Sequence, residues 1–140
     1  AAISTGKVLQ VVSANDSTPL SSSSTSYIDT GTSASITPSS SSNKVLVIVT
    51  TGVHGVDSAT TTGLRLKLVR GSTDLIEQTS WGSHPTITYI YGQGHCFNYL
   101  DSPSSTSSIT YKLQYKSNDG TNHVLENAST AVMTLLEVSA

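Results

Sequence analysis

The stretch Leu64-Arg65-Leu66-Lys67-Leu68 decides the fold, because a leucine alternates there with a charged residue at every second position. Successive side chains of a β-strand point to opposite faces, so this pattern predicts a strand with one face in a core and the other in water. We expect this strand to cover residues 62–70. The same period of two returns at 109–117, where one face would carry Ile109, Tyr111, Leu113 and Tyr115.

Two other segments are apolar on both faces. Residues 44–53 contain the run Val45-Leu46-Val47-Ile48-Val49, and residues 131–138 are apolar apart from Thr134 and Glu137. A strand of this kind is typical of the interior of a sheet, so we expect 44–53 to lie centrally and 131–138 to close the chain. Together they present more apolar surface than one core can cover, and part of it is expected to contact a neighbouring molecule.

The remaining predicted strands are short and are separated by loops rich in Ser, Thr, Gly and Asn. Val, Ile, Thr and Tyr favour strands, whereas helix signals are nearly absent, and we expect about seven to nine strands in total. The additional strands are predicted at 6–13, 25–30, 33–37, 73–80, within 85–100 around a bend at Gly92 and Gly94, and at 122–126. The main loops are predicted at 14–24, 38–43, 80–85 and 101–108, with a tight turn at 118–122.

Many short strands with turn signals between them indicate a β-sandwich or a barrel. We expect a single all-β domain over residues 1–140, an antiparallel jelly-roll-like β-sandwich, with residues 1–5 as an extended N-terminal arm. A jelly roll brings the last strand beside the first. An immunoglobulin-type sandwich is the alternative, but its Cys…Trp…Cys spacing is missing because the chain holds one cysteine.

The composition excludes several classes of protein. The chain has 140 residues, of which 26 are Ser and 20 are Thr, while charged residues make up 11% and the net charge is −2. There is no basic excess for binding phosphates, so nucleic acid is not an expected partner. No apolar run approaches the length of about 20 residues that spans a bilayer as a helix, so no membrane partner is expected either.

The first residues, Ala1 to Lys7, match neither a secretory signal nor a transit peptide. We expect that an initiator methionine was removed before Ala1 and that the chain is a complete small protein made in a cytoplasm.

Runs of serine precede two of the predicted strands, at Pro38-Ser39-Ser40-Ser41-Ser42-Asn43 and at Pro103-Ser104-Ser105-Thr106-Ser107-Ser108. Such runs can be disordered linkers. Each of these is shorter than ten residues and leads directly into an apolar strand. Because serine and threonine hydroxyls can hydrogen-bond to turn backbone locally, we predict ordered surface loops.

No arrangement of residues predicts catalysis, a metal or a cofactor. Cys96 follows His95 directly, and adjacent side chains of a strand point to opposite faces, so the two would not form a nucleophile and base pair. The four histidines, His54, His84, His95 and His123, fall in no metal-binding pattern. Asp74 and Glu77 are predicted to be solvated charges rather than a pair of catalytic carboxylates. We therefore expect a protein that is not an enzyme.

Aromatic residues are the candidate contact residues. Trp81 and His84 lie in the predicted loop 80–85, and Tyr89 and Tyr91 follow shortly after it. A tryptophan in a loop can anchor an oligomer interface, or it can stack against the flat face of a sugar. Both interpretations of Trp81, His84, Tyr89 and Tyr91 stay open at this stage.

Several phrases of the sequence resemble a group of small virion proteins from tailed phages of cyanobacteria and other aquatic bacteria. The phrases occur in the same order over most of the chain: Gly6-Lys7-Val8-Leu9-Gln10-Val11-Val12, Ser35-Ile36-Thr37-Pro38-Ser39-Ser40 with Lys44-Val45-Leu46-Val47, Leu68-Val69-Arg70-Gly71-Ser72-Thr73, and Leu100-Asp101-Ser102-Pro103 with Thr110-Tyr111-Lys112-Leu113-Gln114. Residues 54–62 are less similar and are expected to form a variable loop.

The resemblance implies a β-rich module on the surface of a virion, usually a trimer. In the first hypothesis a homotrimer decorates the outer surface of the capsid as a cement protein and binds the major capsid protein. In the second, the chain is a head or tail fibre module that recognises a host surface glycan. An enzyme such as a glycan depolymerase is the third and least favoured hypothesis, because the resemblance supplies no catalytic motif.

Overall fold

The computed structural model describes residues 6–52, 54–57, 62–82, 89–92, 94–119, 121–124 and 129–140. Within these ranges the chain forms twelve β-strands and no helix. The strands are β1 (Val8–Asp16), β2 (Leu20–Ser22), β3 (Ile28–Ile36), β4 (Lys44–Thr50), β5 (His54–Asp57), β6 (Thr62–Arg70), β7 (Thr73–Gly82), β8 (Tyr89–Gly92), β9 (Cys96–Asp101), β10 (Ile109–Asp119), β11 (Thr121–Val124) and β12 (Ala131–Val138).

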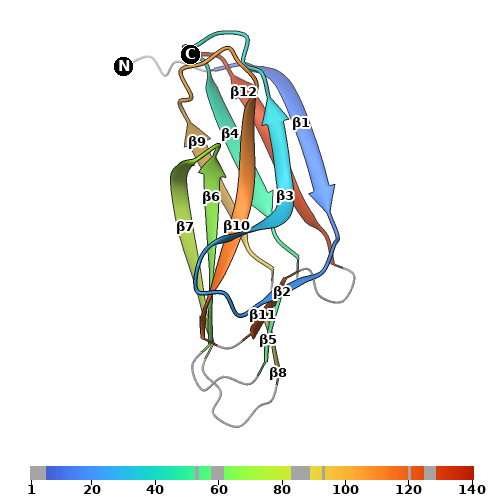
Figure 1. The fold of residues 1–140 in the computed structure, drawn as a ribbon. Coiled ribbons are helices and arrows are strands. Elements are labelled where there is room, and N and C mark those ends of the chain that lie inside the picture. Colours follow the sequence, from blue (N-terminus) through green and yellow to red (C-terminus); the bar gives the residue numbers. More distant parts are fainter. Residues whose placement is uncertain are drawn as a thin grey trace, which may run out of the picture.

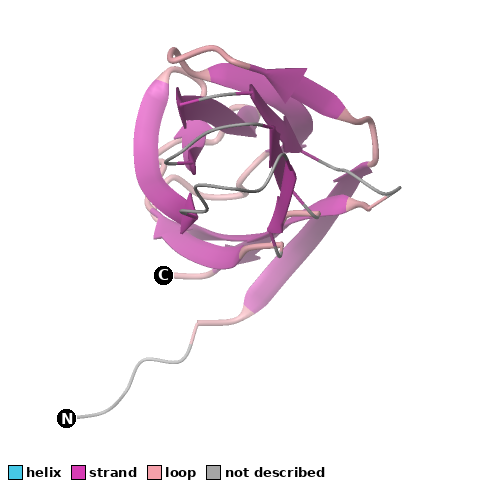
Figure 2. Cartoon of the chain, turned by 90° about the horizontal axis from the view of Figure 1, so that it is seen from below, coloured by secondary structure: helices cyan, strands magenta, loops and turns pink. Residues whose placement is uncertain are grey.

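Two antiparallel sheets pack face to face as a sandwich (Figure 1). Sheet I has the strand order β1-β12-β4-β9, and sheet II has the order β3-β10-β6-β7. The long strands therefore alternate between the two sheets along the chain except at β6 and β7, which are both in sheet II, and the first long strand pairs with the last. Eight strands wound in this way form a jelly roll, which confirms the predicted fold class. Seen from below, along the strands, the strands curve around a common centre (Figure 2).

A third, small sheet continues one end of the sandwich. Sheet III has the order β2-β11-β5-β8. Each of its strands directly follows or precedes, along the chain, the strand that has the same position in sheet I: β2 follows β1, β11 precedes β12, β5 follows β4 and β8 precedes β9. Sheet III thus continues sheet I, and a short stretch of the chain separates each strand of sheet I from its continuation in sheet III. The two chain ends lie at the opposite end of the molecule, where Ser139 N donates to Lys7 O at 2.9 Å (Figure 1).

The core lies between sheets I and II and follows the predicted alternation. Leu64, Leu66 and Leu68 are at most 2% exposed, and so are Tyr111, Leu113 and Tyr115. From sheet I, the core takes every second residue of the two central strands: Val45, Val47 and Val49 of β4, and Ala131, Met133 and Leu135 of β12. The predicted central position of the strand beginning at residue 44 is confirmed, although it ends at Thr50.

One strand was predicted as two. Residues 25–30 and 33–37 were assigned to separate strands, whereas β3 runs without a break from Ile28 to Ile36. Gly31 lies inside it with φ of 96°, and the pairing with β10 shifts register there. A bulge of this kind accommodates an irregular residue without ending the strand. Thr30, at the end of the first predicted strand, and Thr32, in the gap before the second, are both buried, so threonine fills core positions here.

Three other expectations were wrong in detail. The predicted loop 14–24 contains β2, and Trp81 lies in β7 rather than in a loop. Within the expected variable loop 54–62, residues 54–57 form β5. The strand predicted at 122–126 is present as β11, and it pairs with β2 and β5. Short strands at the end of a sandwich are set by long-range pairing, which local patterns do not reveal.

Local hydrogen bonds from backbone N–H groups to serine hydroxyls stabilise the described serine-rich loops. A serine hydroxyl accepts from the backbone N–H two residues later in each of four cases: Ser22 from Ser24 at 3.0 Å, Ser24 from Ser26 at 3.1 Å, Ser40 from Ser42 at 3.3 Å and Ser105 from Ser107 at 3.0 Å. These bonds satisfy turn backbone without a partner strand, as the sequence analysis predicted for the serine runs.

Candidate interaction surfaces

The outer face of sheet I carries aliphatic side chains interspersed with neutral polar ones. Its outward side chains alternate with the core residues, and we call the following aliphatic set the apolar face: Leu9, Val11, Leu46, Ile48, Leu100, Val132, Leu136 and Val138. The outward neutral polar residues of the same strands are Ser13, Asn15, Thr50, Asn98 and Thr134. The charged residues of the four strands are Asp16, Lys44, Asp101 and Glu137. Asp101 and Glu137 are buried, and Asp16 lies on the inward side of β1, so Lys44 at the start of β4 is their one outward charge.

One row of the apolar face crosses the whole sheet. Val11 pairs with Leu136, Leu136 with Leu46, and Leu46 with Leu100. The row therefore places one large aliphatic side chain on each of the four strands at one level. Its two ends, on the edge strands, are the most exposed: Val11 is 58% and Leu100 is 51% exposed. Val8 and Leu9, also on β1, are 55% and 48% exposed.

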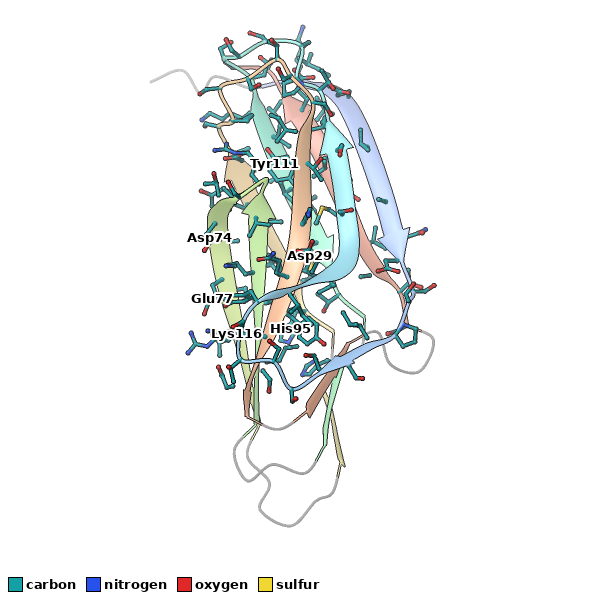
Figure 3. All side chains as sticks on the ribbon, viewed as in Figure 1. Asp29, Asp74, Glu77, His95, Tyr111 and Lys116 are labelled. Carbon is teal, nitrogen blue, oxygen red and sulfur yellow. The ribbon has the colours of Figure 1, made fainter. Side chains whose placement is uncertain are left out.

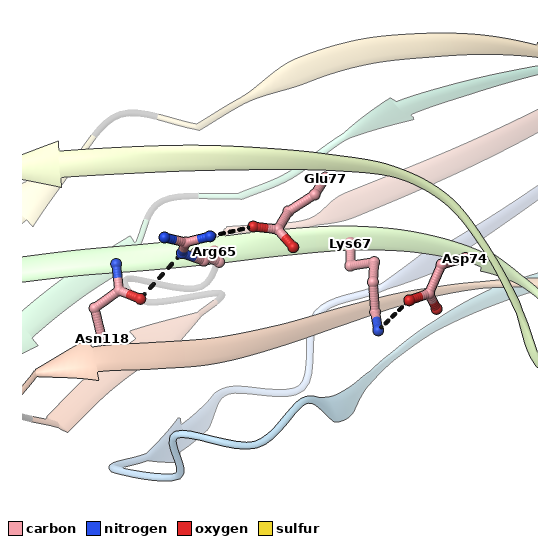
Figure 4. A network of polar contacts seen from close by, with 5 residues as sticks. All are labelled: Arg65, Lys67, Asp74, Glu77 and Asn118. Atoms are coloured by element: carbon pink, nitrogen blue, oxygen red, sulfur yellow. Dashed lines mark hydrogen bonds and ion pairs between the residues drawn. The ribbon is translucent and has the colours of Figure 1, made fainter.

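The outer face of sheet II is charged instead. Arg65 pairs with Glu77 at 2.6 Å and Lys67 with Asp74 at 3.0 Å, across β6 and β7 (Figure 4). Lys112 pairs with Asp29 at 2.9 Å, across β10 and β3. We call this surface the charged face. Asp74 and Glu77 lie along β7 and Lys116 near the lower part of β10 (Figure 3). The side chains of Asp74 and Glu77 are 66% and 36% exposed, so both are solvated charges, as predicted.

Tyr27 joins two of these cations. The Lys67 ammonium lies 3.9 Å from the centre of the Tyr27 ring, and the Lys116 ammonium lies 4.9 Å from it. The negative face of an aromatic ring attracts a cation at such distances. The charged face is therefore held together by its own ion pairs and ring contacts.

Among the residues whose burial the structure describes, Glu137 is the most completely buried carboxylate, at 1% exposure. Burial is the largest single influence and raises its pKa, but the hydrogen bonds it accepts from Asn43, Ser39 and Gln10 together lower the pKa to about 2. The bonds are 2.6 Å long from Asn43 Nδ2 and 2.7 Å from Ser39 N, Ser39 Oγ and Gln10 Nε2. The ionised carboxylate thus fixes the 38–43 loop and β1 to β12.

Asp101 connects the two main sheets. It lies at the end of β9 in sheet I, is 5% exposed, and accepts hydrogen bonds from two side chains of sheet II. Arg70 Nη1 lies 2.8 Å from its Oδ2, and Tyr111 Oη donates to the same oxygen at 2.7 Å. Burial and then this hydrogen bond raise the pKa of Tyr111. The group is a cross-link of the sandwich rather than a reactive site.

Two histidines that the sequence analysis treated separately stack on each other. The rings of His54 and His95 have centroids 5.2 Å apart and lie 24° from parallel. His95 N donates to Thr51 Oγ1 at 2.7 Å. Cys96, the next residue, is exposed. His95 is partly buried, whereas Cys96 faces outward at the start of β9.

The four candidate contact residues are only partly placed. Trp81 lies opposite Gly63 near the end of β7, and Tyr89 and Tyr91 lie on β8 opposite Asp57 and Gly55. Both strands reach the end of the sandwich away from the chain termini (Figure 1). His84 lies outside the described residues. The structure thus places three of the four at one end of the molecule, without describing their side chains.

Among the described residues, no group of three or more His, Cys, Asp and Glu side chains could hold a metal ion. In the same part of the chain, no helix is long and apolar enough to cross a membrane.

No family model and no curated protein matches the sequence. Solved structures that resemble the fold include the VP2 subviral particle of infectious bursal disease virus, at 14% identity and a TM-score of 0.45, covering 92% of this chain and 38% of that one. A structure of the whole particle of the same virus matches at 14% identity and a TM-score of 0.45, covering 92% and 37%.

A third is the insecticidal delta-endotoxin Cry8Ea1 of Bacillus thuringiensis, at 14% identity and a TM-score of 0.38, covering 86% of this chain and 19% of that one. In all three comparisons the chain spans well under half of the longer protein.

Proposed function

We propose that this chain is a virion structural protein, and that as a homotrimer it decorates and stabilises the outer surface of a phage capsid. The observation that carries the proposal is the contrast between the two outer faces of the jelly roll. The charged face binds its own charges in ion pairs, whereas the apolar face carries a row of aliphatic side chains across all four strands. A contiguous exposed apolar surface is typical of a site at which another protein binds.

The ordered phrases that resemble small phage virion proteins support the same proposal. A protein that binds the assembled shell and not its free subunits stabilises the shell by mass action. Three linked copies that engage three neighbouring sites gain further through effective concentration, even where one copy binds weakly. Neither effect requires a catalytic group.

Purified virions test this function. Quantitative mass spectrometry should find hundreds of copies per particle, and the protein added to bare shells should raise their melting temperature until the sites are saturated. A copy number confined to a few tail positions, together with no effect on bare shells, would overturn the proposal. We further propose that the chain is not an enzyme, and sugar release from host polysaccharide by the pure protein would contradict that.

One observation favours a second candidate, a fibre module that binds a host glycan. The backbone positions of Trp81, Tyr89 and Tyr91 lie at the end of the sandwich opposite the chain termini. Aromatic rings at a free end could stack against sugar rings. Binding on a glycan array that Trp81→Ala abolishes would favour this candidate, while a glycan signal that the variant leaves unchanged would count against it.

A further inference from the structure

We propose that the apolar face of sheet I is the surface through which three copies of this chain assemble, with the three faces turned toward a common threefold axis. This inference rests on the proposed function for its homotrimer, and it adds which surface forms the trimer and which residues meet. The charged face would then point outward.

The charge distribution is the first reason. The one outward charge of sheet I is Lys44, which is exposed at the start of β4 and so at one end of the face. The rest of the face can pack against copies of itself without burying an unpaired ion. Packing copies through the charged face would instead desolvate the ion pairs of Arg65, Lys67 and Lys112. The composition of the two faces therefore selects sheet I.

The width of the sheet is the second reason. Four strands spaced about 4.8 Å apart make a face about 19 Å wide, and three such faces enclose a triangular prism whose axis lies about 5.5 Å from each face. Packed sheets lie about 10 Å apart, so each contributes a side-chain layer about 5 Å thick. Three faces of this width fill the centre of the prism without leaving a channel.

The pattern of exposure is the third reason. Among the residues whose exposure the structure describes, the exposed large hydrophobic side chains are on the two edge strands of sheet I: Val8, Leu9 and Val11 on β1 and Leu100 on β9. In the prism these edges form the corners, where β9 of one copy meets β1 of the next. Because Val11 and Leu100 end the same row, Leu100 of each copy comes level with Val11 of its neighbour.

The first test is the oligomeric state, measured by sedimentation equilibrium between 1 and 100 µM. The wild-type chain should be a trimer. Leu136→Lys, at the centre of the apolar face, should raise the concentration needed for half-assembly more than about 100-fold, since it places three unpaired ammonium groups at the axis. The matched control is Gln114→Lys, which is also outward, half-buried and on a central strand, but in sheet II, and it should remain a trimer.

The second test needs no destabilised variant. In a Cys96→Ser background, Val11→Cys combined with Leu100→Cys should give covalent trimers on mild oxidation, because each bond links one copy to the next around a closed ring. The control pair Ser33→Cys with Asp74→Cys occupies the two edge strands of sheet II, at one level of that sheet. It should give no covalent trimers.

Three results would overturn the inference: a wild-type monomer or dimer at 100 µM, a Leu136→Lys chain that remains a trimer, or covalent trimers from the control pair alone. A Leu136→Lys trimer that no longer binds bare shells would assign the face to the shell instead. Shell binding by the wild-type chain is measured in parallel. If the wild-type chain forms a trimer that Leu136→Lys disrupts, but does not bind bare shells, the proposed function is contradicted and this inference still holds.

Discussion

Glu137 shows how a buried charge is held by its hydrogen bonds. Its pKa of about 2 lies below the usual 4.5, so the stabilisation from its ionised form is present above pH 4.5 and is lost as pH falls toward 2. We predict that Glu137→Gln lowers the free energy of unfolding at pH 7 by about 3 kcal/mol. Urea titrations at pH 7 and at pH 3 measure the effect, which should shrink markedly in acid.

The control for this prediction is Asp74→Asn, because the Asp74 side chain is 66% exposed and pairs with Lys67 at the surface. It should cost less than about 1 kcal/mol at pH 7. An equal loss for Glu137→Gln at both pH values would mean that the shape of the side chain matters and its charge does not.

Asp101 carries a second prediction at the level of single residues. Asp101→Ala should lower the free energy of unfolding by about 3–5 kcal/mol, because it leaves Arg70 and the Tyr111 hydroxyl without their buried acceptor. Tyr111→Phe removes one hydrogen bond only and should cost about 1 kcal/mol. A double-mutant cycle on these two changes, measured in urea, should give a coupling energy well above zero. Simple additivity would show that the contact does not join the sheets.

Within a single element, the backbone of β3 depends on Gly31. Its φ of 96° is outside the range that residues with a Cβ adopt readily, and a Cβ there would collide with the Asp16 carboxylate. Gly31→Ala should therefore lower the free energy of unfolding by about 2–3 kcal/mol. Gly71 also has a positive φ, of 56°, but a Cβ there would meet nothing within 4 Å.

Gly71→Ala is thus the matched control, and thermal or urea unfolding of both variants makes the comparison. Gly71→Ala should lower the free energy of unfolding by about 1 kcal/mol, which is the strain of the backbone alone. Equal losses at the two glycines would show that the contact with Asp16 adds nothing.

The long strands could be predicted from the sequence because each carries its own signal. The alternation in β6 and β10 depends on nearest neighbours along the chain, and so do the two-sided apolar runs of β4 and β12. Short strands such as β2 and β5 have no such signal, since they form only where another strand is already present. The bulge at Gly31 was missed for the same reason: glycine and threonine indicate a loop until the pairing with β10 is known.

The apolar face could be anticipated but not located from the sequence. The excess of apolar residues in 44–53 and 131–138 indicated a contact with a neighbour. The row from Val11 to Leu100 joins residues far apart in the chain, and only the register of four strands brings them level. The sequence predicts the aromatic residues around Trp81 as contact residues instead, because a rare residue type can be recognised in a sequence. The strand register that brings distant residues level across a sheet cannot.

At the scale of the whole molecule, assembly through the apolar face should make stability depend on concentration. Folded trimers are favoured over unfolded chains by mass action, so raising the concentration from 1 to 100 µM should raise the thermal midpoint by about 5 °C. Calorimetry on the wild-type chain measures the shift. Leu136→Lys should melt at one temperature across that range, and Gln114→Lys should behave like the wild type. A wild-type midpoint that does not move with concentration would mean that the jelly roll folds without its neighbours and that its apolar face stays open to water.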